Sequence, residues 1–384
     1  GLQDLSKEMG IRERKYHGRL PNIQIDKTCP SIIRDPAKCI LCGRCIRVCD
    51  EIIGVSAIDV VGRGNESRIG TSYNKGLSMR NCVKCGQCIM VCPTGALTER
   101  SNLDSVLEAL NNPDLYPVIQ LSPTVAASVG EDLNIRASKD IRNLLRAGLK
   151  KAGFRQVYDV AMAADVAIME EAAEYLERTQ SHTALPLLTS CCPSWVKYIE
   201  SSFPALLPHL SRAASPQQIM GRLIKHYIAS SASLKPEQVF VVSVMPCTAK
   251  KHEAAGDTAR EGSLRNVDAV LTNRELVKLV TLLGIDFPAL EPEPGDPHFS
   301  IRSSAGNLFG VSGGHLEGLL RTIQYMATGQ DGPVQKLTEL RGLKSRKEAR
   351  VKIGKTNIHV AAVSGLANVR TMAEEILAGK SCFS

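Results

Sequence analysis

Short apolar runs alternate with amphipathic helical patterns from about residue 113 onward. Three of the runs indicate strands buried on both faces of a parallel sheet, because each is nearly continuous in hydrophobic residues and ends at small or special residues. They are YPVIQLS (116–122), ALPLLTS (184–190) and QVFVVSVMP (238–246). Two further runs, VDAVLT (267–272) and NIHVAAVSG (357–365), predict a second sheet. The pattern therefore predicts an α/β fold of two lobes, with parallel sheets flanked by helices.

The carboxyl ends of the predicted strands are the expected place for a functional site, because open parallel sheets form their crevice there. A Pro-rich surface loop, ALEPEPGDPHF (289–299), separates the two sets of strands. Neighbouring cysteines hardly ligate one metal centre together and do not easily form a disulfide with each other. The strand ends carry Ser122-Pro123, Cys191-Cys192 and Pro246-Cys247.

Length and charge exclude few functions. The 384 residues are enough for two or three domains and contain no run of about 18 apolar residues that would span a membrane. Part of the net charge of +8 lies in RGLKSRKEARVKIGK (341–355) and near Arg12, Arg14 and Lys15. These residues indicate either a solvated basic face or a docking surface for an acidic partner such as a small electron carrier. Nucleic acid is disfavoured, because the basic run has no interleaved aromatic residues.

The chain contains thirteen cysteines, and their spacing indicates what they bind. Eight of them form two runs, CILCGRCIRVC (39–49) and CVKCGQCIMVC (82–92), each with the spacing C-x2-C-x2-C-x3-C. This doubled spacing is typical of ferredoxins with two [4Fe–4S] clusters, in which the fourth cysteine of each run binds the other cluster. We therefore predict an α+β ferredoxin-like domain that holds two clusters. One cluster is assigned Cys39, Cys42, Cys45 and Cys92, and the other Cys82, Cys85, Cys88 and Cys49.

Other uses of these thiols fit less well. Structural zinc sites favour pairs of C-x2-C motifs over runs of four cysteines. A disulfide framework of this density belongs to short secreted chains. Cys29 lies outside both runs and is expected to be a free thiol. The two runs thus indicate a module that transfers electrons.

Segments that follow this module resemble signature motifs of the iron-only, or [FeFe], hydrogenases. TSCCPSW (189–195) and MPCTAKKHE (245–253) resemble the first two motifs, and SPQQIMG (215–221) and LFGVSGG (308–314) resemble further family segments. The ferredoxin-like module precedes them in the family's order, so the resemblance covers essentially the whole chain. It implies the H-cluster as cofactor, a [4Fe–4S] cube joined through one cysteine to a di-iron subcluster with carbonyl, cyanide and dithiolate ligands.

The resemblance also implies roles for individual residues. Cys192 and Cys247 match two ligands of the cube. Lys250 matches the residue whose ammonium holds a cyanide, which suits a compact point charge. Cys191 would face the open coordination site of the di-iron unit as a proton donor and acceptor, rather than act as a small buried hydrophobe. Positions that match the lining of the pocket are Ser122, Pro123, Gln217, Met245 and Phe309.

A proton path is implied as well. IMEEAAEYLER (168–178) has a helical pattern that places Glu171, Glu174 and Arg178 on one face over about 10 Å. Considered alone, this pattern indicates a salt-bridged surface helix. The resemblance implies instead a relay from Cys191 through Glu171, Ser211 and Glu174, with Ser211 bridging the two carboxylates and Arg178 at the exit.

Two features near residue 310 carry no predicted role. GNLFGVSGG (306–314) fits neither the dinucleotide-binding pattern G-x-G-x-x-G nor a phosphate loop, so nucleotide binding is not expected within this chain. His315 follows this segment and is expected to be a surface histidine whose hydrogen bonds are satisfied.

The implied function is the reversible reduction of protons to dihydrogen by an oxidoreductase. Electrons would come through the [4Fe–4S] clusters from a ferredoxin or similar small carrier, and maturation proteins would supply the di-iron subcluster. Further subunits, linked to NAD(P) or formate, stay open. The alternatives are a hydrogenase-like iron–sulfur assembly or scaffold protein and a hydrogen sensor, both of which tend to lose the relay cysteine that this sequence retains. The cytoplasm is the expected compartment, with the hydrogenosome as the alternative.

The sequence predicts three parts: the tail of an N-terminal region (1–28), a ferredoxin-like domain (29–105) and a catalytic domain (106–384). The first residues lack the apolar segment of a signal peptide. The family's third motif supplies two more ligands of the cube, and Cys382 does not match it. We therefore expect the chain to be a fragment, with the third motif beyond residue 384 or on a second polypeptide.

Overall fold

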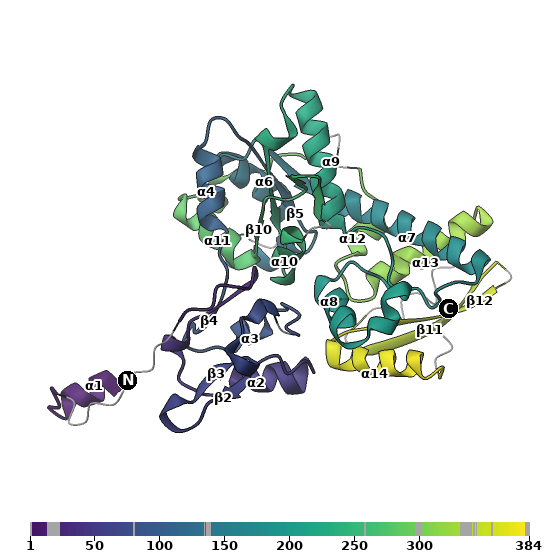
Figure 1. The fold of residues 1–384 in the computed structure, drawn as a ribbon. Coiled ribbons are helices and arrows are strands. Elements are labelled where there is room, and N and C mark those ends of the chain that lie inside the picture. Colours follow the sequence, from purple (N-terminus) through teal and green to yellow (C-terminus); the bar gives the residue numbers. More distant parts are fainter. Residues whose placement is uncertain are drawn as a thin grey trace.

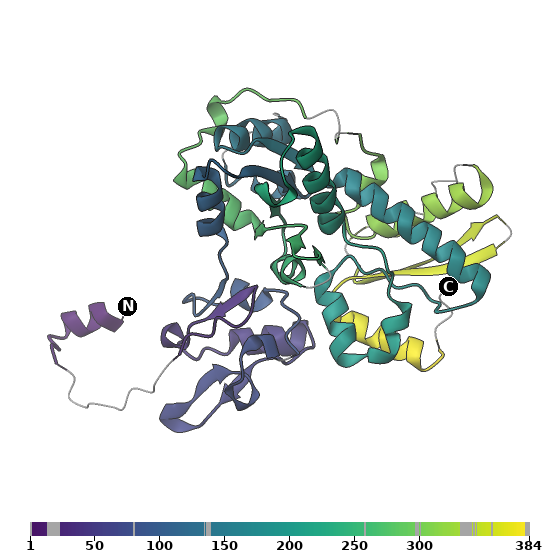
Figure 2. The same cartoon turned by 45° about the horizontal axis from the view of Figure 1, so that its top comes forward.

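The computed structural model describes most of the chain in three regions. A ferredoxin-like module (residues 26–99) lies beside a sheet lobe, built on a four-stranded sheet, and a hairpin lobe, built on a β-hairpin (Figure 1). The long helix α7 (Ala161–Ser181) runs from the sheet lobe into the hairpin lobe, as Figure 2 also shows. The described residues are 2–13, 24–79, 81–133, 135, 140–256, 259–295, 299, 301–330, 340, 342, 344–354 and 356–380.

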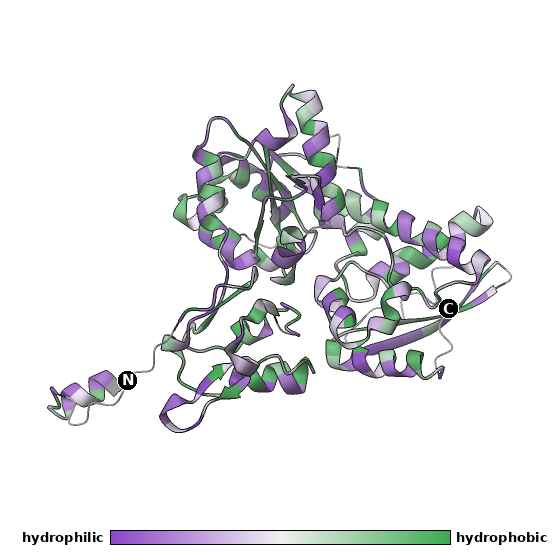
Figure 3. Ribbon diagram, viewed as in Figure 1, coloured by the Kyte–Doolittle hydropathy of each residue, from purple (hydrophilic) through white to green (hydrophobic). Residues whose placement is uncertain are grey.

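The sheet of the sheet lobe is parallel and is covered on both faces, as its apolar runs predict. Ile119 and Leu121 pack on one face among α4 (Leu103–Asn111), α5 (Val125–Val129), α6 (Ile141–Lys151) and α11 (Asn273–Leu282). Val118 packs on the opposite face against α9 (Pro216–Ser231). This alternation follows from the two-residue period of a strand. The strands are largely hydrophobic in Figure 3. Their order is β10 (Ala269–Leu271), β7 (Val239–Val244), β5 (Tyr116–Leu121) and β6 (Gln156–Asp159).

Two predicted strands are wrong in detail. The run 267–272 contributes β10 to this same sheet rather than to a second one. The run 184–190 forms no strand and pairs only at one bridge, between Leu188 and Leu210. Pro186 has no N–H to donate to a ladder, and the Ala184 carbonyl accepts a hydrogen bond from the Arg178 side chain instead.

The hairpin lobe holds the second sheet, which is antiparallel rather than parallel. β11 (Arg346–Ile353) pairs with β12 (Thr356–Val363), and this hairpin packs on α7 and α13. The basic run 341–355 therefore forms a strand in part, and its Lys347 is buried and donates to Ser312 Oγ at 2.8 Å. The other described basic residues of this run stay exposed or half-buried, so Lys347 alone departs from the predicted solvated basic face.

The ferredoxin-like module consists of two small antiparallel sheets and two short helices that follow the first cysteines of each run. Its core combines aliphatic side chains with thiols. Asp26 belongs to it, since its carboxylate accepts a hydrogen bond from Leu77 N at 3.0 Å. The elements are β1 (Ile32–Arg34) with β4 (Leu97–Glu99), β2 (Asp59–Val61) with β3 (Arg68–Gly70), α2 (Arg44–Arg47) and α3 (Gln87–Met90).

The remaining helices cover the sheet and frame the site. In the described part of the chain, none of the helices has the length and apolar composition needed to cross a bilayer. They are α1 (Leu2–Glu8), α4 (Leu103–Asn111), α5 (Val125–Val129), α6 (Ile141–Lys151), α8 (Pro193–Ser202), α9 (Pro216–Ser231), α10 (Ala249–Ala255), α11 (Asn273–Leu282), α12 (Ser304–Leu308), α13 (Gly314–Thr328) and α14 (Leu366–Leu377).

Candidate functional site

Four thiols of the ferredoxin-like module line one small cavity. Cys39, Cys42 and Cys45 come from the first run and Cys92 from the second. Gly43 takes φ +70° directly before α2, which turns the chain so that three cysteines surround one space. Burial would raise the pKa of Cys92, but hydrogen bonds from its neighbours lower it, which favours the thiolate that iron binds. These are the four residues predicted for one cluster.

The other four thiols also gather together. Burial raises the pKa of Cys88 well above its usual value, and the nearby thiols of Cys82, Cys85 and Cys49 raise it further. Cys49, which belongs to the first run in sequence, is therefore close to the second run, as is Cys45. A cluster core that binds such thiolates relieves their mutual repulsion. Within the described part of the chain, no three Cys, His, Asp or Glu side chains converge on a single metal ion.

The second thiol group adjoins the sheet lobe and the hairpin lobe. Cys85 lines a cavity of about 540 Å³ together with Cys192 and Cys247. Thr248 Oγ1 donates to the Lys84 carbonyl oxygen at 2.8 Å and so ties the module to α10. At Gly86 a Cβ atom would lie 2.5 Å from Thr248 Oγ1, and φ is +75°, so this contact requires glycine.

Cys192 and Cys247 reach this cavity from two helix starts. Cys192 precedes α8, whose first residue is Pro193, and Cys247 follows β7 shortly before α10. Burial raises the pKa of Cys192, although the Lys250 ammonium opposes this. Lys250 Nζ donates to the Cys191 carbonyl oxygen at 2.9 Å and lies 3.0 Å from Glu253. The structure thus brings together both predicted cube ligands and Lys250.

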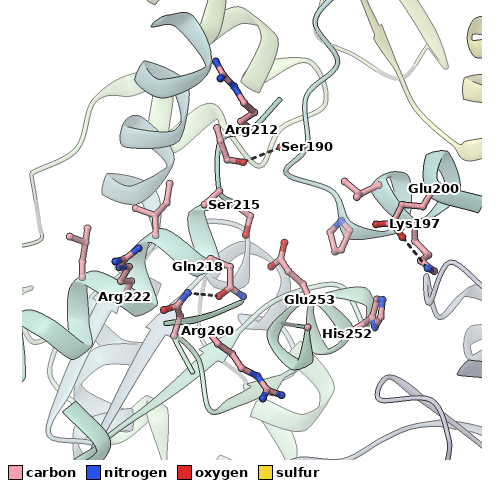
Figure 4. A pocket seen from close by; sticks show the side chains of 18 of the residues that line it. Ser190, Lys197, Glu200, Arg212, Ser215, Gln218, Arg222, His252, Glu253 and Arg260 are labelled. Carbon is pink, nitrogen blue, oxygen red and sulfur yellow. Dashed lines mark hydrogen bonds and ion pairs between the residues drawn. The ribbon is translucent and has the colours of Figure 1, made fainter. Parts of the chain in front are cut away.

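A wider cleft of about 860 Å³ lies against Ser190 and Pro193, which flank the Cys191-Cys192 pair. Figure 4 shows polar side chains from α8, α9 and α10 around it. Ser215 Oγ and Gln218 Nε2 are buried here and have no hydrogen-bond partner among the described residues. The cysteine pair therefore separates a thiol-lined cavity from a polar cleft.

The predicted lining residues occupy different places. Gln217 lies beneath Lys250, because its Nε2 donates to the Lys250 carbonyl at 3.2 Å and to Glu253 at 3.0 Å. Met245 packs into the core under the sheet. Phe309 stacks on His315 with ring centroids 4.3 Å apart. Ser122 and Pro123 line a separate small cavity at the carboxyl end of β5, beside Arg142 and Arg146.

The carboxylates predicted for the relay are buried, so α7 is not the surface helix that its pattern alone suggested. Glu171 is 2% and Glu174 6% exposed. Ser211 Oγ donates to Glu174 Oε2 at 2.7 Å, and Arg178 Nη2 lies 2.6 Å from Glu174 Oε1. Burial would raise the pKa of Glu174, but hydrogen bonds from Ser211, Arg178 and Arg212 lower it. No hydrogen bond joins Ser211 to Glu171 among the described side chains. Ser211 therefore binds one of the two carboxylates that it was predicted to bridge.

His315 is not a surface histidine. Its side chain is 13% exposed, and its Nε2 lies 2.6 Å from Glu171 Oε2. Its Nδ1 lies 3.7 Å from the sulfur of Cys191. The imidazole therefore stands between two residues of the predicted relay.

Comparison with known proteins identifies the family. The model described as "Iron only hydrogenase large subunit, C-terminal domain" matches residues 116–383. The chain belongs to the iron-only hydrogenase family. A second model, "NADH-quinone oxidoreductase subunit 3, ferredoxin-like domain", matches residues 29–98. The family assignment and the two-part fold predicted from sequence are thereby confirmed.

Individual relatives of this hydrogenase-family chain have more than one function. It is 39% identical to "NADP-reducing hydrogenase subunit HndD" of Solidesulfovibrio fructosivorans, over 99% of this chain and 66% of that protein. It is 33% identical to "Cytosolic iron-sulfur assembly component 3" of Bos taurus, over 68% of this chain and 57% of that protein. An apo [FeFe]-hydrogenase HydA1 variant from Chlamydomonas reinhardtii has 30% identity and a TM-score of 0.64, over 74% of this chain and 80% of that one. The chain thus spans less than two thirds of the length of these curated relatives.

The residue predicted for the exit of the relay lies elsewhere than expected in this hydrogenase-family chain. Arg178 is 7% exposed, and its guanidinium donates to main-chain carbonyls such as that of Leu210, so it is an internal clamp. The exposed end is formed by Arg212, whose side chain is 68% exposed and lies 3.1 Å from Glu174 and 2.7 Å from Glu177. Sequence spacing gave no signal for Arg212, because it reaches Glu174 from a loop.

Proposed function

We propose that this protein catalyses the reversible reduction of protons to dihydrogen, with electrons supplied by a ferredoxin or similar small carrier. One observation supports this most strongly. The thiol-lined cavity and the buried carboxylates of α7 meet at one pair of residues, with Cys192 on the thiol side and Cys191 beside His315 and Glu171. A reaction that combines electrons with protons needs both kinds of side chain at one place.

The chain's thiols fit iron–sulfur cofactors. Cys39, Cys42, Cys45 and Cys92 would hold one [4Fe–4S] cluster, and Cys49, Cys82, Cys85 and Cys88 a second. Cys192 and Cys247 would supply two thiolates to the cube of an H-cluster, and the partly buried Lys250 ammonium, which lies against the Cys191 carbonyl, would face an anionic ligand. When bound, that cofactor supplies the metal centre at which protons and electrons combine.

The remaining residues bind and move protons. Glu174 stays ionised and can accept a proton, because Arg178 and Arg212 compensate its charge. Ser211 holds the carboxylate in place through its 2.7 Å hydrogen bond. Arg212 and Glu177 connect this carboxylate to solvent. Protons would thus pass between the protein surface and Cys191 along α7, on the side of the thiol-lined cavity where His315 lies.

An assembly or scaffold function is the second candidate, because relatives include the cytosolic iron-sulfur assembly component. Such a protein needs cluster ligands but no buried acid–base path. Glu171 and Glu174 are buried together beside Cys191 and His315, an acid–base group that a scaffold does not need, so their presence favours turnover. We also propose a cytoplasmic location and maturation proteins as partners, as the family resemblance implies.

The full-length protein, matured anaerobically, tests the proposal. We expect hydrogen evolution and uptake with a reduced carrier, together with infrared bands of iron-bound carbonyl and cyanide. A protein that shows ordinary iron–sulfur spectra but no such bands and no hydrogen turnover would have the assembly function instead. Replacement of Lys250 by Met is expected to remove the infrared bands while the clusters of the ferredoxin-like module stay intact.

A further inference from the structure

His315 occupies the gap between the thiol and the first carboxylate of the relay. Its Nδ1 lies 3.7 Å from Cys191 Sγ, and its Nε2 lies 2.6 Å from Glu171 Oε2. No described hydrogen bond joins Cys191 to Glu171 directly. Neither Glu171 Oε2 nor His315 Nε2 has another polar partner among the described side chains. The two ring nitrogens therefore point at different members of one path.

The fold holds the ring in this position. Gly313 takes φ +83° and starts α13, so that His315 falls in the first turn facing α7. Only glycine fits at position 314 without a shift of the backbone, since a Cβ atom there would lie 2.0 Å from the Leu308 carbonyl oxygen. Phe309 stacks on the imidazole at an interplanar angle of 32°. The ring is thus fixed by backbone geometry and by a neighbouring aromatic side chain.

The surroundings favour a charged imidazole. Burial alone would lower the pKa of His315, but its hydrogen bonds and charge interactions with Cys191 and Glu171 raise it to about 10. The start of a helix disfavours a cation, so these two partners must outweigh that effect as well. Glu317, the other acid nearby on α13, pairs with Arg321. His315 can therefore hold a proton at neutral pH inside the protein.

A purely structural pairing would leave part of this arrangement unexplained. A histidine that only neutralises Glu171 needs one ring nitrogen, and its second nitrogen would go to a main-chain group or to solvent. Here the second nitrogen faces the thiol of the signature motif instead. The pairing of His226 with Glu261, at 2.9 Å on an exposed surface, is an example of the simpler case within the same chain.

We infer that His315 is an additional relay residue, which passes protons between Glu171 and the Cys191 side of the site. In the direction of hydrogen formation, the imidazolium gives its Nδ1 proton to the Cys191 thiolate, which becomes a thiol, and the ring becomes neutral with its remaining proton on Nε2. The next proton delivered through Glu171 restores the imidazolium beside the Glu171 carboxylate. This inference rests on the proposed function, and it makes Cys191 and Glu171 partners of an imidazole rather than of each other.

The protonation of His315 can be measured without turnover. The full chain, free of clusters and labelled with 15N in its eight histidines, gives imidazole resonances, and His315→Phe identifies the one from His315. We expect this ring to be an imidazolium at pH 7.5 and to lose its proton at a lower pH in Glu171→Gln. A neutral ring at pH 7.5 that does not respond to Glu171→Gln would overturn the inference.

Turnover gives the second readout. In the matured full-length protein, His315→Phe should lower hydrogen turnover at least about 100-fold and flatten its pH profile, because a general acid–base group is lost. His226→Phe is the matched control and should stay within twofold of wild type. His315→Gln, which keeps polar contacts but does not exchange protons, should be as slow as the Phe variant. Normal turnover in both His315 variants would overturn the inference.

Failure of the inference and failure of the proposed function give different results. If the wild type makes no hydrogen, the proposed function fails, whereas the NMR titration still decides whether His315 holds a proton against Glu171. If the wild type is active and His315→Phe does not fold, His315→Gln and the titration decide instead.

Discussion

Two groups of buried titratable side chains meet in this molecule, and they differ in how the sequence builds them. The thiol group lies within two short runs, where three cysteines on one turn surround one space. The acid–base group is assembled from α7, from the loop at Ser211 and Arg212, and from α13 at His315. The thiolates would repel one another without metal, whereas Glu174 is already compensated by arginines and Glu171 by His315. The first group is thus local and depends on a cofactor, and the second is long-range and complete in the protein alone.

The largest effect is expected for variants of Cys49, the cysteine of the first run that is predicted to bind the cluster of the second run. If Cys49 and Cys82 bind the same cluster, the double variant Cys49→Ala with Cys82→Ala should lose only one cluster, about four iron atoms. Cys49→Ala with Cys39→Ala should lose both. Iron content and electron paramagnetic resonance of the reconstituted protein measure this. Equal iron content in the two double variants would show that Cys49 and Cys82 do not bind the same cluster.

A large effect is also expected for Glu174→Gln. The change leaves the buried Arg178 without its charge partner, so the protein should lose about 3 kcal/mol of stability and most of its turnover. Glu177→Gln, at an exposed pair, is the control and should change little. Chemical unfolding and hydrogen turnover give the two readouts, and similar values for both variants would contradict the internal role of Glu174.

The low pKa of Glu174 also predicts a dependence of stability on pH. Because the folded pKa lies below the usual 4.5, the contribution of this group is present above pH 4.5 and is lost as pH falls through the folded value. The wild type should therefore lose more stability than Glu174→Gln between about pH 5 and pH 3. Parallel curves for the two proteins would mean that the carboxylate is not stabilised by its partners.

A moderate effect is expected at the contact between the ferredoxin-like module and the sheet lobe. Gly86→Ala adds a Cβ near Thr248 and forces a non-glycine residue to φ +75°, so it should cost about 1–2 kcal/mol. Combining it with Thr248→Ala should recover part of that loss by removing the steric contact. No recovery in thermal unfolding would mean that the backbone strain alone is responsible.

The smallest effect is expected at the solvent end of the acid group. Arg212→Ala removes an exposed guanidinium, so stability should change by less than about 1 kcal/mol. Turnover should fall a few-fold, because Glu174 loses one of its connections to solvent. Arg222→Ala, at another exposed ion pair, is the control. A loss in Arg212→Ala as large as that of Glu174→Gln would place the exit elsewhere.

The sequence predicted local features better than long-range ones. Apolar runs predicted β5 and β7 correctly. The assignment of the eight cysteines to two clusters, with Cys49 on the cluster of the second run, stays a prediction that the proximity of these thiols supports. The run 184–190 was wrong because a short apolar run containing proline can be an extended loop as well as a strand. The role of His315 could not be seen, since its partners lie 124 and 144 residues away along the chain and spacing carries no signal over that distance.

The central claim is that electrons and protons reach the Cys191-Cys192 pair by separate paths. Stopped-flow reduction and hydrogen turnover of matured Cys191→Ser, compared with wild type, measure it most directly. We expect the clusters of the ferredoxin-like module to be reduced at the wild-type rate while hydrogen turnover falls at least about 100-fold. Unchanged turnover, or slower cluster reduction in step with slower turnover, would contradict the claim.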